Sequence, residues 1–372
     1  MTVALLTTYL SPYRVLLYTR LAERYGVEVL CFAGGERYVP PWFANLDEQL
    51  AAAPFPARRA HGAREAFVTG RRYDAVIAPF AGGAIMPAAY AGARLARRPF
   101  VLWASVWAQP RSRGHLLTLP AIRHIYRHAD AVVTYGPHVS RFVAGIRGGD
   151  DGVFVAPQAV EPELFARTVP AAEVDAFRAA HDLGEGPLVI YVGRFVAEKG
   201  IDVLLRAWRS VTSATLVLVG DGPLAEQAAR VPGVRVLGAL PRTALAAAYA
   251  SAAFAVLPSI PTPRFREPWG LVCNEAMHQG RPVIVSDAVG AAAGGLVRDG
   301  VNGLVVPAGD ADALAGAISS LLADSALRER LGAAAQEAVA AYTPDAMATA
   351  FGQALAAAGV AGATGSGGAR SH

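Results

Sequence analysis

Short apolar runs alternate with helix-length segments along the whole chain and form two series. The first series predicts buried strands at residues 3–6, 27–31, 75–78, 100–102, 131–134 and 152–156. After a looser stretch over 168–186, the second predicts strands at 188–192, 215–219, 234–237, 254–257, 282–285 and 303–306. Strands separated by helices are typical of parallel sheets with right-handed crossovers. The pattern therefore predicts an α/β protein.

Two such series predict two doubly wound, Rossmann-like domains facing a central cleft, with the ligand at the carboxyl ends of the strands. We expect the first domain over 1–166 and the second over 167–343. A further helix, expected over 344–358, would pack back on the first domain. Residues 359–372 are rich in Gly, Ala and Ser, which predicts a disordered tail.

Composition narrows the class of protein. A formal net charge of +4 over 372 residues does not require nucleic acid as a partner. The two cysteines, Cys31 and Cys273, match neither a metal-ligand spacing nor a disulfide framework, which favours a reducing cytoplasm. The uncharged stretches 75–93 and 243–263 contain prolines and are not expected to span a membrane. No charged segment precedes the first apolar run, so we expect no signal peptide.

Lys199 is the only lysine among 34 basic residues, so 34 − 1 = 33 are arginines. It follows a predicted strand in the segment Gly193-Arg194-Phe195-Val196-Ala197-Glu198-Lys199-Gly200, before a predicted helix. Two cations between a strand's carboxyl end and a helix N-terminus favour an anion site. Arg194 could fork onto two diphosphate oxygens while Lys199 acts as a point charge. The alternatives are a solvated surface turn and a lysine kept by chance.

A second group of residues follows the predicted strand 254–257 and opens a helix. Glu267 lies in the loop, and Gly270, Leu271 and Val272 could offer free backbone amides to a phosphate. Glu275 lies further along the helix, where it could bind a ribose diol. The alternative is a pair of surface glutamates. A glycosidase is disfavoured, because its two carboxylates must flank one bond, whereas these lie beside the phosphate site.

Taken together, the motifs of the second half resemble a known family. They are Gly193-Arg194…Lys199-Gly200, Gly220-Asp221-Gly222-Pro223, Pro258-Ser259, Glu267-x7-Glu275 and Gly280-x-Pro282-Val283-Ile284. In order and spacing they resemble the donor domain of the family 4 retaining glycosyltransferases, which have the GT-B fold, from about 188 to 314. The element Pro12-Tyr13-Arg14 resembles an acceptor-side loop of one subgroup.

The resemblance implies a metal-independent hexosyltransferase that uses a nucleotide-diphosphate sugar, needs no cofactor and retains the anomeric configuration. The first domain would bind the acceptor and the second the donor. Arg194 and Lys199 would hold the diphosphate, and Glu267 would contact the sugar. These three would be the catalytic residues. Gly222 and the amides of Trp269, Gly270, Leu271 and Val272 would line the donor site, and Glu275 would bind ribose. Bacterial cell-surface glycans and glycosylated metabolites are both expected product classes.

The chain departs from the family in three places. Pro268 removes one amide from the donor loop, and Gln158 stands where asparagine is usual. Many relatives have a histidine after the strand expected at 100–102, whereas none occurs here before His115. The acceptor-side candidates are therefore Tyr9, Ser11, Arg14, Trp107 and His115.

The segment 111–127 interleaves leucines and isoleucines with arginines. It is expected to be an ordinary amphipathic helix of the first domain. The alternative is a basic surface that docks on the inner face of a membrane carrying a lipid-linked acceptor.

Two other functions compete with glycosyl transfer. One is a different GT-B enzyme, such as a sugar-nucleotide epimerase, which would lack the Glu-x7-Glu set. A phosphorylase would need a pyridoxal lysine, and Lys199 already belongs to the anion site. The other is a non-catalytic partner subunit that binds a nucleotide sugar without transferring it.

Overall fold

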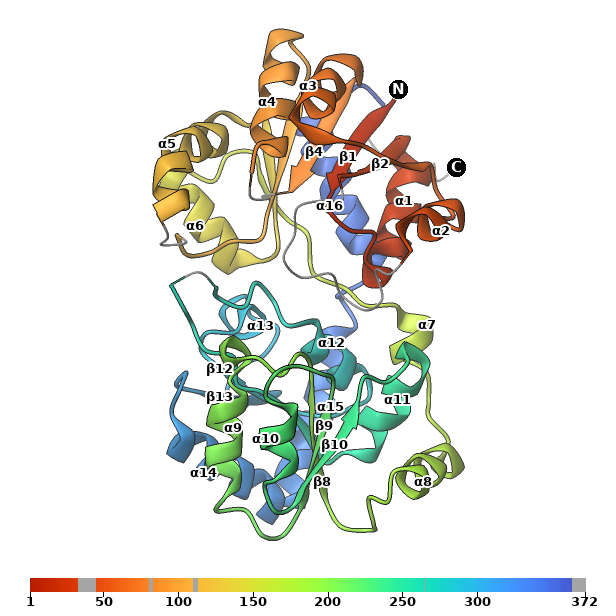
Figure 1. Ribbon diagram of the computed structural model, residues 1–372, viewed down its shortest axis with the longest axis vertical. Coiled ribbons are helices and arrows are strands. Elements are labelled where there is room, and N and C mark those ends of the chain that lie inside the picture. Colours follow the sequence, from red (N-terminus) through yellow and green to blue (C-terminus); the bar gives the residue numbers. More distant parts are fainter. Residues whose placement is uncertain (33–44, 80–82, 110–112, 264, 363–372) are drawn as a thin grey trace, which may run out of the picture. The chain divides into compact units, whose positions relative to one another are not determined.

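The computed structural model describes residues 1–32, 45–79, 83–109, 113–263 and 265–362, with only the backbone at 113–117. The chain forms two compact units, Met1–Gln158 with Pro344–His372, and Ala159–Thr343 (Figure 1). The boundary lies at Gln158 and not at the expected 166, because α7 (Pro162–Phe165) packs on α11 (Arg242–Ser251) and α12 (Leu271–His278).

The first unit contains a seven-stranded parallel sheet in the order β3-β2-β1-β4-β5-β6-β7. Its strands are β1 Val3–Thr7, β2 Val27–Cys31, β3 Ala57–Arg59, β4 Ala75–Pro79, β5 Phe100–Ala104, β6 Ala131–Thr134 and β7 Val153–Val155. All the apolar runs predicted here form strands. The edge strand β3 is not predicted, because its Ala-Arg-Arg sequence has no apolar pattern and is never fully buried.

Helices cover both faces of this sheet. They are α1 Val15–Tyr25, α2 Leu46–Ala51, α3 Gly62–Arg72, α4 Ile85–Leu95, α5 Arg113–His128, α6 Pro137–Arg147 and α16 Pro344–Ala357, with a 3-10 turn η1 at Pro12–Arg14. Alternate strand residues separate two cores: Val3 and Leu5 face one, and Ala4 and Leu6 face the other. Successive side chains of a strand point to opposite faces of the sheet, and helices cover both faces. A strand with both faces covered is therefore apolar along its whole length.

The C-terminal helix α16 belongs to the first unit, although it follows the second in sequence (Figure 1). It packs against α1, and Met347 and Phe351 are buried in the shared core. Val360 is also buried there, so the chain remains packed beyond the expected start of the tail at 359. Residues 363–372 of that expected tail lie outside the described part.

The second unit contains a six-stranded parallel sheet in the order β10-β9-β8-β11-β12-β13. Its strands are β8 Leu188–Val192, β9 Thr215–Val219, β10 Val234–Gly238, β11 Phe254–Leu257, β12 Val283–Ser286 and β13 Gly303–Val306. Its further helices are α8 Ala171–Ala180, α9 Ile201–Trp208, α10 Ala225–Ala229, α13 Gly290–Ala293, α14 Ala311–Ala323 and α15 Ser325–Val339, with a 3-10 turn η3 at Ala197–Lys199. The chain order reverses between β8 and β11, and doubly wound sheets bind ligands at the carboxyl ends beside such a reversal.

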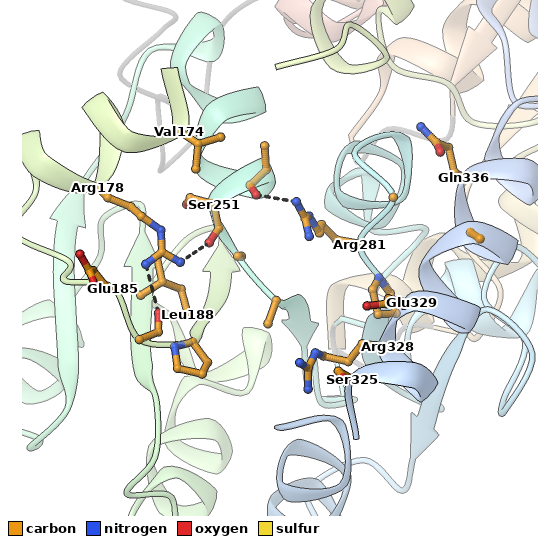
Figure 2. A pocket seen from close by; sticks show the side chains of 18 residues that line it. Val174, Arg178, Glu185, Leu188, Ser251, Arg281, Ser325, Arg328, Glu329 and Gln336 are labelled. Atoms are coloured by element: carbon orange, nitrogen blue, oxygen red, sulfur yellow. Dashed lines mark hydrogen bonds between the residues drawn. The ribbon is translucent and has the colours of Figure 1, made fainter. Parts of the chain in front are cut away.

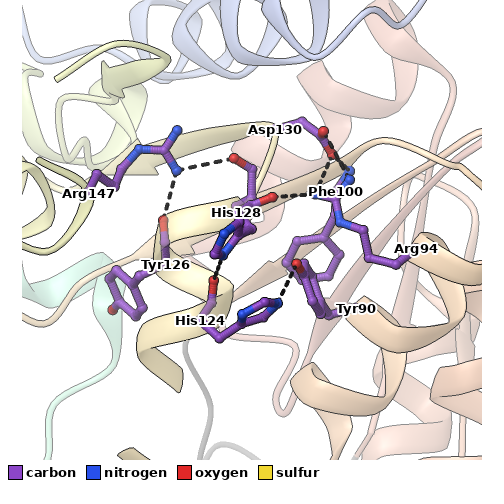
Figure 3. A network of polar contacts seen from close by, with 9 residues as sticks. Tyr90, Arg94, Phe100, His124, Tyr126, His128, Asp130 and Arg147 are labelled. Atoms are coloured by element: carbon purple, nitrogen blue, oxygen red, sulfur yellow. Dashed lines mark hydrogen bonds and ion pairs between the residues drawn. The ribbon is translucent and has the colours of Figure 1, made fainter. Parts of the chain in front are cut away.

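The described half of α5 is anchored to its neighbours. Ile125 is buried in the first unit's core and Ile122 packs against it. Figure 3 shows that Arg147 donates to the carbonyl of Tyr126 (2.8 Å), and that Arg94 pairs with Asp130 (2.9 Å) just beyond the helix end. These isoleucines therefore face the protein, as in an ordinary amphipathic helix, and not a membrane. In the described part of the chain, no helix has both the length and the apolar character needed to cross a bilayer.

Candidate functional site

Two loops meet at the reversal point of the second sheet, one after β8 and one after β11. Gly200 (φ +73°) ends η3, and a Cβ there would lie 1.9 Å from the carbonyl oxygen of Pro258. The amide of Ile260 also donates to the carbonyl of Glu198 (3.0 Å). Only glycine fits this approach at a positive φ. The close contact joins the segment with the lone lysine to the segment leading to Glu267.

Lys199 and Glu267 form a largely buried ion pair. Lys199 Nζ lies 2.5 Å from Glu267 Oε2, with side-chain exposures of 17% and 7%. Ser259 donates a hydrogen bond to the same carboxylate oxygen (3.0 Å). The Lys199 ammonium also lies 5.5 Å from the centre of the Phe265 ring. The sequence therefore identified two residues that the structure brings into direct contact.

The main chain around Glu267 is held on its other side by the loop after β12. Glu267 forms an isolated parallel bridge with Val289, and the amide of Gly290 donates to its carbonyl (3.1 Å). A Cβ on Gly290 would lie 2.0 Å from the carbonyl oxygen of Pro268. The loop is therefore fixed by backbone contacts that do not depend on its side chains.

Free amides lie where this loop enters α12. Gly270 has φ +96° and precedes the first helical residue, Leu271. Among the described residues, no acceptor is found for the backbone N–H groups of Gly270, Leu271 and Val272. Such groups at a helix N-terminus favour an anion. The side chain of Trp269 is not part of this surface: it is buried, and its Nε1 donates to Asn274 Oδ1 (2.8 Å).

Arg194 and Gly222 lie on neighbouring loops of the same sheet edge. The Arg194 side chain is 42% exposed, with Nη2 3.7 Å from Glu198 Oε1. Its carbonyl accepts a hydrogen bond from the Tyr191 hydroxyl (2.8 Å), which fixes the turn. A Cβ on Gly222 would lie 2.6 Å from the carbonyl oxygen of Phe195, so the two loops pack main chain to main chain. Arg194 is thus a half-exposed cation on a rigid turn.

Glu275 lies apart from the Lys199–Glu267 pair, in a different environment. Its Oε2 accepts a hydrogen bond from the Tyr249 hydroxyl on α11 (2.7 Å). Burial raises the pKa of Glu275, while the Tyr249 hydrogen bond and the charge of Arg242 oppose that rise. The two glutamates of the motif therefore have separate hydrogen-bond partners.

The acceptor-side candidates divide into buried and accessible residues. Ser11 and Arg14 are buried at 8% and 5% exposure, whereas Tyr9 and Trp107 are partly exposed. Arg14 donates to Gln158 Oε1 (2.6 Å) and the Tyr135 hydroxyl (3.1 Å). Its guanidinium group also lies 5.0 Å from the Trp103 ring. Arg14 thus fills a cage inside the first unit. His115 lies on α5, where only the backbone is described.

Three contacts between polar side chains and the candidate residues were not predicted from the sequence. His138, 4% exposed on α6, has its ring 5.1 Å from that of Trp107. It follows β6, whereas a histidine was sought only after β5. Ser259 was noted as part of a motif without its partner Glu267. Tyr249 had no usable signal, because its partner lies on another helix.

Comparison with known proteins bears on the fold of the chain. Residues 186–324 match a family model described as glycosyl transferases group 1. The structure of Anabaena Alr3699/HepE in complex with UDP-glucose superposes with a TM-score of 0.79 at 20% identity, covering 96% of this chain and 99% of that one. Sucrose-phosphate synthase from Thermosynechococcus elongatus gives a TM-score of 0.70 at 24% identity, covering 95% and 98%. The chain has the GT-B fold.

Curated relatives are similar to this chain over part of their length. The phosphatidyl-myo-inositol mannosyltransferase of Mycobacterium leprae is 38% identical over 166 residues, which are 42% of this chain and 43% of that protein. A GDP-mannose-dependent mannosyltransferase of Mycolicibacterium smegmatis is 31% identical over 232 residues, 58% of each. The chain thus spans about half the length of the curated relatives it matches. Within the described residues, no three His, Cys, Asp or Glu side chains are grouped as metal ligands would be.

Proposed function

We propose that this protein is a family 4 glycosyltransferase that moves a hexose from a nucleotide-diphosphate sugar to an acceptor hydroxyl with retention of configuration. The observation that carries the proposal is the Lys199–Glu267 pair beside the free amides of Gly270–Val272, at the reversal point of a doubly wound sheet. A cation, a carboxylate and helix-terminal amides are the groups that a sugar diphosphate requires.

In this proposal the diphosphate binds between Arg194, Lys199 and the amides of α12. An ammonium group has three donors, so Lys199 can keep its bond to Glu267 while it binds a phosphate oxygen. Glu267 would then accept hydrogen bonds from sugar hydroxyls, and its orientation is set by Ser259. Glu275 would accept from the ribose diol. As the sugar–phosphate bond breaks, the cations and amides stabilise the charge that develops on the leaving diphosphate.

We further propose that these protein cations replace a divalent metal, so that transfer survives EDTA. The test is donor turnover with and without excess chelator, followed by addition of Mg²⁺ or Mn²⁺. Loss of turnover that a metal restores would refute metal independence without touching the donor-site proposal.

We make one further proposal, about the acceptor and about where in the cell the protein acts. One relative is named a phosphatidyl-myo-inositol mannosyltransferase and another a lipopolysaccharide core biosynthesis glycosyltransferase, so a lipid-linked acceptor at the cytoplasmic face of a membrane is our first expectation. Ile122 and Ile125 belong to the core, so contact would rest on the exposed arginines of the helix, Arg123 and Arg127. Sedimentation with anionic liposomes at low and high salt tests this contact. Absence of binding at both salt concentrations would refute it.

A thermal-shift screen of sugar nucleotides is the decisive first experiment, because a ligand that binds only the native state raises Tm. UDP-glucose and GDP-mannose are the first probes, since HepE is described with UDP-glucose and one relative as GDP-mannose-dependent. Donors that raise Tm are then assayed for hydrolysis and for transfer. Binding without either reaction, across acceptor classes, would favour a non-catalytic partner subunit.

A further inference from the structure

A cavity of about 720 Å³ lies on the opposite edge of the second sheet from the Lys199 site. Figure 2 shows the side chains that line it. It is bounded by the segments that enter three strands, at Leu188 of β8, Ala253 before β11 and Pro282 before β12. Residues of α8 and α15 complete it. We call it the basal cavity. Its volume lies within the roughly 300–1,000 Å³ of small-molecule sites.

Three arginines line the basal cavity, and their hydrogen bonds to other described residues all go to backbone carbonyls. Arg178 donates to Gly184 (2.7 Å), Gly186 (3.1 Å) and Ser251 (2.9 Å). Arg281 donates to Ala250 (2.6 Å), and Arg328 donates to Leu322 (3.0 Å) and Leu321. Within the part of the chain that the structure describes, none of the three forms an ion pair with a carboxylate.

Two of these charges oppose each other. Arg178 and Arg281 reach the end of α11 from either side (Figure 2). Burial, and then the positive charge of Arg178, lower the pKa of Arg281. Among the residues that the structure describes, its buried Nε has no hydrogen-bond partner. Capping the carbonyls of α11 accounts for one bond of each guanidinium, and Arg178 makes two more to Gly184 and Gly186, but a guanidinium has five N–H donors. The capping role therefore leaves donors and positive charge uncompensated.

Two carboxylates line the same cavity, and neither forms an ion pair within the described part of the chain. Glu185 and Glu329 are lining residues, and both are exposed. A site with guanidinium groups and separate carboxylates suits a ligand with both an anionic group and hydroxyl donors. A phosphate monoester carries about −1.5 to −2 charges and accepts forked bonds from arginine.

We propose that the basal cavity binds a phosphorylated polyol of low molecular mass, with its phosphate on Arg281, Arg178 and Arg328 and its hydroxyls on Glu185 and Glu329. The ligand would join α8, the end of α11 and α15, and would relieve the repulsion between Arg178 and Arg281. Nothing in this proposal depends on glycosyl transfer.

Calorimetric titration of the full chain with ribose 5-phosphate, inorganic phosphate and ribose tests the proposal. The titrations use an Arg194→Gln/Lys199→Met variant, so that phosphate binding at the other sheet edge does not contribute. We expect saturable binding of ribose 5-phosphate, about tenfold weaker binding of inorganic phosphate and none of ribose. Equal affinity for the two phosphates would overturn the polyol assignment, and no saturable binding of either would overturn the site.

Variants locate the binding. Arg281→Gln with Arg328→Gln should weaken ribose 5-phosphate binding at least about tenfold, because two charge-assisted contacts are lost. Arg330→Gln is the matched control: it lies on α15 but does not line the cavity, and should change affinity less than about twofold. Should Arg281→Gln fail to fold, Arg328→Gln alone supplies the comparison. Unchanged affinity in the folded Arg variants would refute the assignment.

Discussion

Lys199 and Glu267, 68 residues apart in sequence, meet as an ion pair of 2.5 Å. The carboxylate is almost fully buried, so the ammonium compensates a charge that would otherwise be costly to bury. The pair therefore has a structural role in addition to any role in donor binding. That role can be separated from a role in binding, because the two respond differently to conservative substitutions.

Removing one member of this pair should cost more than removing both. Lys199→Met leaves the Glu267 carboxylate buried beside Ser259, and Glu267→Gln leaves the ammonium without its partner. We expect a coupling free energy of about 1–3 kcal/mol between the two substitutions, measured by urea unfolding of the single and double variants. Additive effects would mean that the contact contributes nothing to stability.

The same residues should be needed for transfer. Lys199→Ala and Glu267→Ala should each lower turnover at least about 100-fold, because each removes a contact to the diphosphate or the sugar. Lys199→Arg keeps the charge but not the compact ammonium, and should also lose most activity. Circular dichroism checks that the fold is intact. Near-wild-type turnover in a folded Lys199→Ala protein would contradict the site assignment.

The backbone contact between Gly290 and Pro268 should fix the loop that carries Glu267. Gly290→Ala places a methyl group 2.0 Å from the Pro268 carbonyl oxygen, so the loop must move. We expect a loss of about 2–3 kcal/mol in unfolding free energy, together with weaker donor binding. Gly316→Ala is the matched control, because Gly316 is helical and its added methyl meets open space. That change should stabilise the protein by up to about 1 kcal/mol.

Burial of Glu275 should make stability depend on pH. Its folded pKa lies above the ordinary value of 4.5, so wild-type stability rises as the pH falls from above the folded pKa to the unfolded one. Glu275→Gln removes this dependence and keeps an acceptor for Tyr249. The variant should therefore gain most over wild type at pH 8, with the gain shrinking towards pH 4.5. Urea unfolding at several pH values measures this gain in unfolding free energy. A gain that is largest at low pH would contradict a raised pKa of Glu275.

Glu275→Gln also tests ribose recognition. If the carboxylate accepts from the ribose diol, the variant should lose affinity for UDP but much less for 2′-deoxy-UDP. In calorimetric titrations, we expect the dissociation constant for 2′-deoxy-UDP divided by that for UDP to be about five- to tenfold smaller in the variant than in the wild type. An unchanged ratio would show that Glu275 does not bind the ribose diol.

Arg14 should stabilise the first unit. Arg14→Met keeps the volume but removes the donor to Gln158 and Tyr135, and should cost about 1–3 kcal/mol in urea unfolding. Arg24→Met is the control, because Arg24 also links α1 to α16 but through an exposed pair with Asp345. That pair should contribute less than about 1 kcal/mol. Similar losses for both variants would show that the aromatic cage adds nothing.

The sequence by itself determined the two sheets and the loops that matter. Apolar runs gave every strand except β3, whose three residues have no apolar pattern. Gly200 and Gly270 lie in the loops that carry Lys199 and Glu267, and both loops follow strand ends. These features are local, because strand period, turn conformation and the position of a charge after a strand are set by neighbouring residues.

Only the tertiary structure decided which of these residues meet. It paired Lys199 with Glu267, gave Glu275 to Tyr249, buried Arg14 and placed His138 against Trp107. It also set Arg178 and Arg281 at one cavity, although they lie on segments far apart in the chain. The physical reason is the crossover topology: parallel strands bring distant loops to one edge, and the sequence does not state the strand order that selects them.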